Sequence, residues 1–370
     1  MFNPFITKGY VSPEYFCDRE NETSRIMSEA YNSSNITVFS QRKMGKTGLI
    51  MHSINKLQDE KFKCIYFDVI TTKTLSDFVE EFGKAFLNQG ISKSHKIINK
   101  ASRLFKAFSP VVSTDPITNS LSFELKLNRP DALEYDLDNI CDFIKKSEEK
   151  YFIAIDEFQQ IVNYPEKNTE ELLRSKIQFL NNSSFVFSGS KKDMLLSMFG
   201  SYSKPFYQST TFLELKPIDK DVYSNFIIYN FAQNDIRIDN KSLEFIFEKS
   251  RGITYFVQLF CHYLWNHGNK KINLELTKLI FNRIIDERKS YYDNLATLLT
   301  RRQFGLLKAL AKESGIKQPM SNEFLSSYYL GSASTVKTAL DFLFDKEFIY
   351  KEDGHYYLTD VLLSEWLKRL

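Results

Sequence analysis

The sequence lacks the cysteine spacings that are typical of a disulfide framework or a zinc site. No Cys-x-x-Cys pair is present, and the five histidines are dispersed along the chain. The cysteines are four in number and far apart: Cys17, Cys64, Cys141 and Cys261. We therefore expect reduced, mostly buried thiols, and no metal centre built from cysteine and histidine.

Strong net charge and long apolar segments are also missing. The formal net charge is +3 over 370 residues, so there is no global electrostatic attraction for nucleic acid or acidic lipid. No window approaches the roughly 18 uninterrupted apolar residues of a membrane span. The N-terminal Met1–Phe5 shows no basic segment followed by an apolar core. We expect a cytoplasmic protein without a membrane partner.

The sequence does contain ample material for buried cores, since 43% of its residues are hydrophobic and 15% are aromatic. At roughly 100–200 residues per domain, its length predicts two or three domains.

A candidate phosphate-binding loop follows the apolar stretch Ile36–Phe39 and precedes a helix-like run. Its residues are Ser40, Gln41, Arg42, Lys43, Met44, Gly45, Lys46 and Thr47, followed by Gly48. In such a loop the backbone N–H groups and the helix N-terminus bind phosphate, the lysine reaches the β- and γ-phosphates, and the threonine hydroxyl ligates Mg²⁺. The alternative is a Gly-Lys-Thr tripeptide in an ordinary turn. Ser40 stands where the usual pattern has its first glycine, and serine adopts a positive φ less readily.

A second feature supports the first. Tyr151–Ile155 is an apolar strand that runs directly into Asp156 and Glu157. In a phosphoryl-transfer site Asp156 would hold Mg²⁺ and Glu157 would polarise the attacking water. The alternative is a buried strand that ends at an acidic surface, but two adjacent carboxylates there favour a positive partner such as Lys46 with Mg²⁺.

The next strand, Ser184–Ser188, ends in Gly189 and Ser190. In multi-strand P-loop ATPases a polar residue at this strand end senses the γ-phosphate, and Ser190 is the first candidate. Ser188 is the second candidate, and a plain strand-to-helix turn is the alternative.

The remaining pattern predicts an α/β fold. Strands and helices alternate up to Pro217, which predicts a three-layer α/β/α core with a parallel sheet around the P-loop, over residues 1–218. An inserted hairpin region is expected near 92–133, where Leu121–Leu127 alternates like a half-exposed strand after a basic helix that carries Lys93 to Lys106. We interpret those basic residues as a solvated face rather than a nucleic-acid patch.

After residue 218 the apolar spacing becomes helical, which predicts an all-helical lid over 219–293. Within it, Arg251 either caps a helix end or reaches a phosphate, and the first reading is favoured. Residues 294–370 predict a winged helix: three helices, then a hairpin around Asp353-Gly354. Its third helix carries little positive charge, which favours a protein or intramolecular contact over DNA.

As an ordered set, these motifs resemble the archaeal-type ATPase family of the STAND P-loop NTPases, in the form abundant in Bacteroidetes-like bacteria. The segments that carry the resemblance are Asn3–Phe5, Pro13–Phe16, Arg19–Glu22, Arg42–Thr47, Ile155–Gln159, Gly189–Ser190, Pro205–Ser209 and Asp360–Trp366. The resemblance implies an AAA-related core, a helical lid and a winged helix, with ATP bound between core and lid. It also implies that the Arg19–Glu22 box, with Arg19 and Glu20 among its residues, lies beside the adenine and ribose.

One departure bears on rate. Many relatives place an arginine after the tyrosine that corresponds to Tyr207, and this chain has Gln208 and Ser209 there. Because arginine fingers contribute roughly 10³–10⁵ in rate, slow intrinsic turnover is expected.

We therefore expect an ATP- and Mg²⁺-dependent molecular switch in signalling or defence, which acts on a protein partner or by self-association. The alternative is a DNA-associated ATPase, of the replication-initiator or transposase-helper type, that binds duplex through its winged helix. A third reading, a degenerate nucleotide binder, is disfavoured because Lys46, Thr47, Asp156 and Glu157 are all present.

Overall fold

The computed structural model describes residues 2–90, 104–114 and 121–370. The chain forms two compact units. The first contains Gly9–Ser40 and Gly45–Lys216, and the second contains Met1–Lys8, Gln41–Met44 and Pro217–Leu370. Each unit is described separately below.

The first unit is built on a five-stranded, fully parallel sheet with the order β2-β5-β6-β1-β7. Its strands are β1 (Ile36–Phe39), β2 (Lys63–Asp68), β5 (Tyr151–Asp156), β6 (Ser183–Gly189) and β7 (Thr211–Glu214). Every residue of β1, β5 and β6 is buried, because helices cover both faces of a parallel sheet. The predicted parallel α/β core is confirmed.

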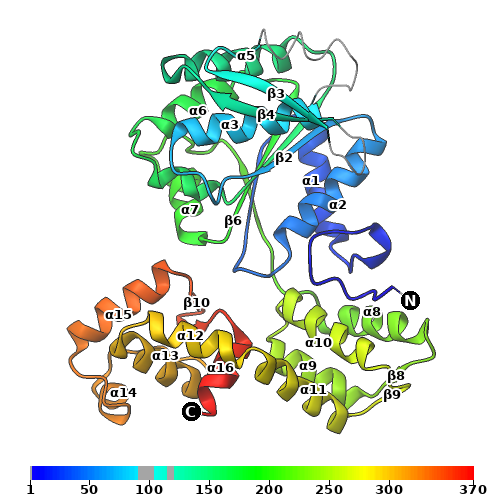
Figure 1. Cartoon of the computed structure of the whole chain (residues 1–370), viewed down its shortest axis with the longest axis vertical. Helices are drawn as coiled ribbons and strands as arrows, with labels where there is room; N and C mark the ends of the chain where they lie inside the picture. The colour runs from blue at the N-terminus through cyan, green and yellow to red at the C-terminus, as the bar shows by residue number, and fades with distance from the viewer. Residues whose placement is uncertain (1, 91–103, 115–120) are drawn as a thin grey trace. The chain divides into compact units, whose positions relative to one another are not determined.

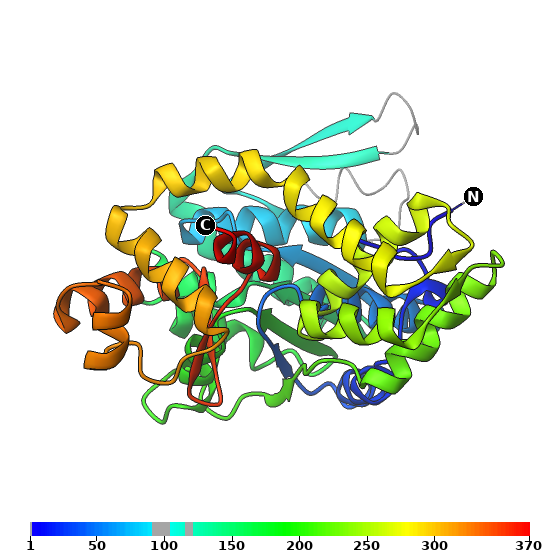
Figure 2. The same ribbon diagram turned by 90° about the horizontal axis from the view of Figure 1, so that it is seen from below.

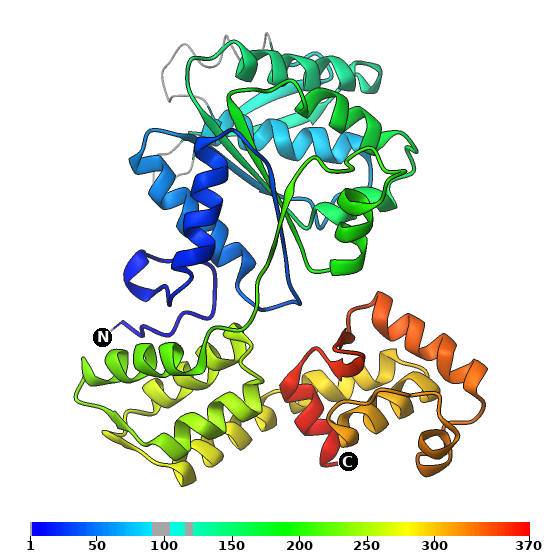
Figure 3. The ribbon, with the colours of Figure 1, turned by 180° about the vertical axis from the view of Figure 1, so that it is seen from behind.

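Two layers of helices enclose this sheet (Figures 1 and 3). The helices α1 and α2 lie together on one face, and α3, α5, α6 and α7 lie on the other. Their bounds are α1 (Glu20–Tyr31), α2 (Lys46–Asp59), α3 (Leu75–Ala85), α5 (Leu133–Lys145), α6 (Thr169–Ile177) and α7 (Lys192–Gly200). Sequence chemistry explains where α3 begins, because the Thr74 and Asp77 side chains and backbone amides bond reciprocally as a capping box. At the start of α1 the sequence favours Asp18 as the N-cap, with Glu20 and Glu22 in the first turn. In the structure Arg19 occupies the N-cap instead, and its side chain makes no capping bond.

Phenylalanine forms much of the core beneath the carboxyl ends of the strands. The rings of Phe158, Phe187, Phe199 and Phe206 are all buried and contact one another at centroid distances of 4.5–5.9 Å. Such aromatic pairs add to the free energy of area burial. Phe158 directly follows the Asp156–Glu157 pair, so this packing fixes the backbone that presents both carboxylates.

The predicted hairpin in the inserted region is confirmed as the antiparallel pair β3 (Phe108–Thr114) and β4 (Leu121–Leu127), which forms a sheet of its own (Figure 2). Buried Asp136 of α5 holds its base by accepting bonds from the backbone N–H groups of Lys106, Ala107 and Phe108 at 2.5, 2.9 and 3.2 Å. Nearly all of the predicted basic helix lies outside the described residues.

The second unit is mainly helical. Its first part contains α8 (Lys220–Ala232), α9 (Asn240–Ser250), α10 (Thr254–His267), α11 (Leu274–Glu287) and the short parallel pair β8 (Arg237–Ile238) and β9 (Lys271–Ile272). Its second part contains α12 (Lys289–Leu298), α13 (Arg301–Glu313), α14 (Asn322–Ser327), α15 (Ala333–Asp345), β10 (Ile349–Glu352), β11 (His355–Leu358) and α16 (Val361–Lys368). Side chains of Asp219, Asp239 and Asn273 cap α8, α9 and α11, which agrees with the helical period in the sequence.

The expected winged helix is present. Three helices, α13 to α15, precede the antiparallel hairpin β10–β11. Asp353 and Gly354 form its two-residue turn with φ values of 47° and 81°, as a primed hairpin turn requires.

Two further expectations concern burial. All four cysteines are free thiols and buried, as predicted. Burial raises the pKa of the Cys64 thiol to about 12, which keeps it protonated and unreactive at neutral pH. In the described part of the chain, no helix combines the length and apolarity needed to cross a membrane.

Candidate functional site

The loop from Ser40 to Thr47 joins β1 to α2, as the sequence predicted. Within it only Lys43 and Gly45 have a positive φ, at 68° and 103°. Ser40 does not, so the serine that replaces the usual first glycine fits without backbone strain. Gly45 is the N-cap of α2, and a side chain at its φ would be strained. The loop therefore presents its backbone and the helix N-terminus as a phosphate site requires.

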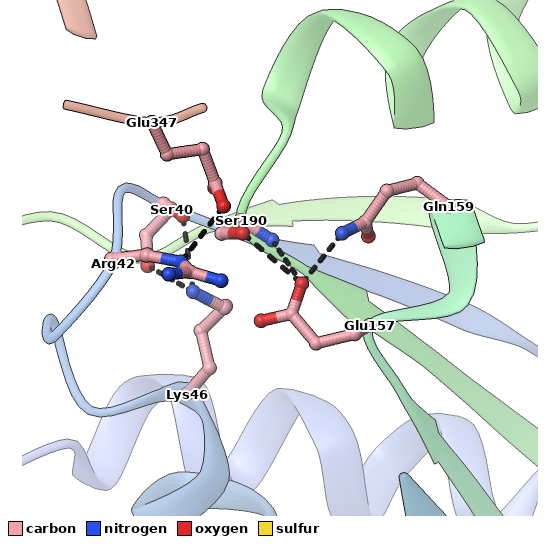
Figure 4. Close-up of polar contacts among 7 residues, drawn as sticks. All are labelled: Ser40, Arg42, Lys46, Glu157, Gln159, Ser190 and Glu347. Atoms are coloured by element: carbon pink, nitrogen blue, oxygen red, sulfur yellow. Dashed lines mark hydrogen bonds and ion pairs between the residues drawn. The ribbon is translucent and has the colours of Figure 1, made fainter. Parts of the chain in front are cut away.

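Lys46 is the first residue of α2 and is 6% exposed. Its Nζ donates to the Ser40 carbonyl oxygen at 3.1 Å and to Ser40 Oγ at 3.4 Å (Figure 4). These two bonds hold the side chain of Lys46 against the first residue of the loop, at the N-terminus of α2.

Asp156, at the carboxyl end of β5, connects the two sequence motifs. Its Oδ2 accepts a bond from Thr47 Oγ1 at 2.7 Å and one from Tyr66 Oη at 3.0 Å. Its Oδ1 accepts one from Ser188 Oγ at 2.5 Å. A carboxylate and a hydroxyl oxygen in contact are the donor set that Mg²⁺ prefers, so these residues fit the ion. Tyr66 was not predicted: its hydroxyl meets Asp156 because β2 pairs with β5.

Glu157 follows in the left-handed conformation, with φ of 54°. One oxygen, Oε2, accepts three bonds: from the backbone N of Ser190 at 3.3 Å, from Ser190 Oγ at 3.1 Å and from Gln159 Nε2 at 2.5 Å. Figure 4 shows these donors converging on that oxygen, while the other oxygen of Glu157 points away from them. Ser190, predicted to sense the γ-phosphate, thus lies directly against the predicted base.

A third carboxylate lies at this edge of the sheet. Asp68 ends β2 and is the register partner of Asp156. The pKa of the Asp68 carboxyl is raised to about 6, mainly by burial; a bond from the Ile70 backbone N lowers it, and the negative charges of Asp156 and Glu157 add to the rise. A divalent cation would relieve this repulsion, so the acidic edge fits a metal ion as well as the Thr47–Asp156 pair does.

The middle of the loop belongs to the second unit. Arg42 Nε pairs with Glu347 Oε2 at 2.9 Å (Figure 4), and Lys43 Nζ lies 3.5 Å from Asp360 Oδ2 and over the ring of Phe256. In the same unit, the Lys43 carbonyl accepts a bond from the Tyr255 backbone N at 3.0 Å. The side chains of Arg42 and Lys43 therefore contact carboxylates of the winged helix, which the sequence alone did not indicate.

Of the Arg19–Glu22 segment, which the resemblance places beside the adenine and ribose, only Arg19 is buried. Arg19 is 5% exposed with φ of 70°, and its Nη1 pairs with Glu22 Oε1 at 2.7 Å. Its Nη2 is buried and donates no hydrogen bond within the described residues. A buried guanidinium nitrogen without a hydrogen bond is costly, which fits a polar ligand atom. Glu20 is exposed at the start of α1, and Gly48 packs near the Phe16 ring, where an added Cβ would lie 3.6 Å from it.

Arg251 occupies the C-cap of α9 with a φ of 52°, so the favoured reading, a helix cap, is confirmed, and its side chain contacts the winged helix. Its Nη2 donates to the Leu358 carbonyl at 2.9 Å and its Nη1 to Tyr350 Oη at 3.4 Å. Its guanidinium lies 5.5 Å from the centroid of the Tyr357 ring. The side chain is thus held within the second unit by three contacts.

Comparisons with known proteins agree with this geometry. Residues 16–258 match the family described as an ATPase domain predominantly from Archaea, and residues 290–369 match a family described as a "probable winged helix domain". No curated protein sequence matches the chain.

Solved structures show the same fold. The Walker-type ATPase PABY2304 of Pyrococcus abyssi aligns with a TM-score of 0.67 at 17% identity, covering 99% of both chains. The ORC2 protein of Aeropyrum pernix, in ADPNP and ADP complexes, aligns with a TM-score of 0.60 at 12% identity, covering 99% of this chain and 96% of that one. The ORC1 protein of Aeropyrum pernix in complex with DNA aligns with a TM-score of 0.51 at 12% identity, covering 96% and 94%. At these identities the likeness concerns the fold.

Proposed function

The chain belongs to the family of ATPase domains found predominantly in Archaea, and from this we propose that it binds ATP with Mg²⁺, hydrolyses it slowly and acts as a nucleotide-dependent switch. The observation that carries the proposal is the contact of Thr47 with Asp156, which joins the phosphate loop to the acidic end of β5. Motifs 109 residues apart in sequence are in hydrogen-bond contact there, which a chance Gly-Lys-Thr turn does not explain.

The proposed roles follow from the chemistry of each group. Lys46 and the backbone N–H groups of Ser40–Gly48 bind the phosphates, and Thr47 and Asp156 hold the metal ion. Bound Mg²⁺ supplies charge neutralisation at the phosphate oxygens. Glu157 accepts a proton from the attacking water through the oxygen that its three donors leave open. Ser190, already bonded to Glu157, contacts the γ-phosphate as a sensor, and Arg19 and Glu20 lie on the nucleoside side.

Slow turnover is part of the proposal. The segment after Tyr207 offers Gln208 and Ser209, so this chain does not supply an arginine from that position to the transition state. A rate lower by roughly 10³-fold or more than that of arginine-assisted relatives follows. A slow ATPase holds each nucleotide state for long enough to serve as a signal.

A switch needs a second element that responds to the loop. Here the contacts of Arg42 with Glu347 and of Lys43 with Asp360 support one, because both carboxylates belong to the winged-helix region. Phosphate oxygens would compete with these carboxylates for the same cations. We propose that this switch is of the STAND class that the motifs resemble, with output in signalling or defence through a protein partner or a second copy.

The decisive experiment measures ATP binding and single-turnover hydrolysis with Mg²⁺ for the wild type, Lys46→Ala and Glu157→Gln. We expect Lys46→Ala to lose binding, and Glu157→Gln to bind ATP without turnover. Lys56→Ala is the matched control, since Lys56 is exposed on the same helix. A wild type that binds no nucleotide would overturn the switch and the hydrolysis together.

DNA association is the second candidate, favoured by the winged helix and by the DNA complex of the ORC1 neighbour. The charge of α15 argues against it, because this would-be recognition helix carries Lys337 against Asp341 and Asp345. Duplex binding that falls steeply with salt would support this candidate, and no binding at 50 mM salt would exclude it.

A further inference from the structure

Gln159 and Gly189 form a close contact beside Glu157 that the roles above do not use. Gln159 follows Glu157 by two residues and is 4% exposed. Its Nε2 donates to Glu157 Oε2 at 2.5 Å, and its carbonyl oxygen, Oε1, has no hydrogen-bond partner within the described residues. The amide must present its nitrogen to Glu157, since an ionised carboxylate only accepts hydrogen bonds.

Gly189 provides the space for this amide. A Cβ added at Gly189 would lie 1.8 Å from Gln159 Oε1 and 2.8 Å from its Cδ, which real structures do not tolerate. The φ of Gly189 is not positive, so backbone conformation does not require glycine at this position. The requirement comes from the close approach of the Gln159 side chain to the last residue of β6.

Stability alone does not account for this arrangement. Phe158 already fixes the turn after β5 through its buried aromatic contacts. A buried amide carbonyl without a partner is destabilising, so a residue selected for packing would be apolar. What the amide does achieve is a third bond to a single oxygen of Glu157, from the side opposite Ser190 (Figure 4).

We infer that Gln159 is a positioning residue for ATP hydrolysis: its amide and Ser190 anchor one oxygen of Glu157 so that the other faces the attacking water, and Gly189 provides the room. This inference rests on the proposed function. Anchoring one oxygen removes the rotation of the carboxylate about its last torsion, so the base is held in one orientation before water arrives.

The test compares single-turnover hydrolysis and ATP affinity in the wild type and Gln159→Met, which keeps the length of the side chain and removes the N–H donor. We expect the rate to fall about 10- to 100-fold, with the Kd for ATP within about twofold of wild type. Gln160→Met is the matched control: the Gln160 amide donates to the Thr72 carbonyl instead, and its rate should stay within about twofold.

Gly189→Ala is a second test, for the case that Gln159→Met folds poorly, because its added Cβ would displace the Gln159 amide. Alone, it should slow hydrolysis as Gln159→Met does. In a Gln159→Ala background the amide is gone and only Leu195 Cδ1, 3.1 Å from the added Cβ, has to shift slightly, so Gly189→Ala should add little further loss. Additive losses, or a parallel loss of ATP affinity, would overturn the inference in favour of a structural role.

The two proposals fail in different ways. If the wild type hydrolyses ATP and Gln159→Met matches its rate, the inference is wrong and the proposed function stands. If the wild type binds ATP without any turnover, the proposed hydrolysis is wrong and the inference falls with it.

Discussion

Thr47 and Asp156 are joined by a 2.7 Å hydrogen bond from hydroxyl to carboxylate. If this pair holds Mg²⁺, Thr47→Val removes one ligand and leaves the shape of the side chain. We expect the affinity for ATP with Mg²⁺ to fall about tenfold or more, with a smaller change in EDTA, since the loop still binds phosphate. Isothermal titration with and without Mg²⁺ measures both. Thr338→Val, at an exposed position of α15, is the control, and equal losses in both buffers would contradict the metal role.

The ion pair between Arg42 and Glu347 predicts a gain of affinity on mutation. Arg42 is 44% exposed and Glu347 18%, so the pair contributes no more than about 1 kcal/mol. Glu347→Gln frees the guanidinium for phosphate, and the Kd for ATP should fall by up to about fivefold at low salt. Because salt screens such charges, the difference should shrink at 0.5 M NaCl. Glu352→Gln, at an exposed carboxylate of the nearby β10–β11 hairpin, should change nothing. Wild-type affinity of Glu347→Gln at low salt would refute the competition.

Arg251 predicts a loss of stability rather than of nucleotide binding. Its bonds to the Leu358 carbonyl and Tyr350 hydroxyl disappear in Arg251→Ala, which should lower the free energy of unfolding by about 1–3 kcal/mol. Arg251→Lys should recover only part of it, because lysine lacks the planar fork that serves both partners. Denaturant unfolding of the full chain gives the values, with exposed Arg302→Ala as reference. Loss of ATP affinity at unchanged stability would instead restore the phosphate reading.

Asp68 predicts a pH dependence of the nucleotide-free protein. Its folded-state pKa of about 6 lies above the ordinary value, so the folded state binds the proton more tightly than the unfolded chain. The contribution of Asp68 to stability is therefore complete below pH 4 and is lost as the pH rises through 6. Asp68→Asn should raise the unfolding temperature at pH 7.5 in EDTA, and this gain should diminish toward pH 4.5. Thermal scans across that range test it; a gain that grows on acidification would contradict the sign.

Much of the first unit was predictable, because its strands and motifs are local patterns. Apolar runs such as Tyr151–Ile155 are followed directly by polar or charged residues. Such residues come together at the carboxyl edge of a parallel sheet, which is where ligands bind. Helix ends were harder to predict, and the expectation that Asp18 caps α1 is wrong: Arg19 adopts the N-cap position in a left-handed conformation that no local signal indicates.

The side chains that hydrogen-bond to Asp156 and Glu157 could not all be predicted, since these contacts depend on strand pairing and side-chain packing. Tyr66 reaches Asp156 from a neighbouring strand, and Gln159 reaches Glu157 only because Gly189 has no Cβ. One weak signal was available in the sequence: the hydroxyl of Ser188, at a buried strand position, needs a partner, and it donates to Asp156. The bond of Arg42 to Glu347 joins residues 305 positions apart, beyond any local pattern.

The backbone bond from the Tyr255 amide to the Lys43 carbonyl has a consequence for observing the molecule. This amide is protected from solvent exchange only while the phosphate loop keeps its present shape, because its acceptor is the loop itself. Hydrogen–deuterium exchange at one amide of α10 therefore records the conformational lifetime of the loop, without label or ligand. In a population that cycles between nucleotide states, the exchange rate of this amide would report how readily the loop opens.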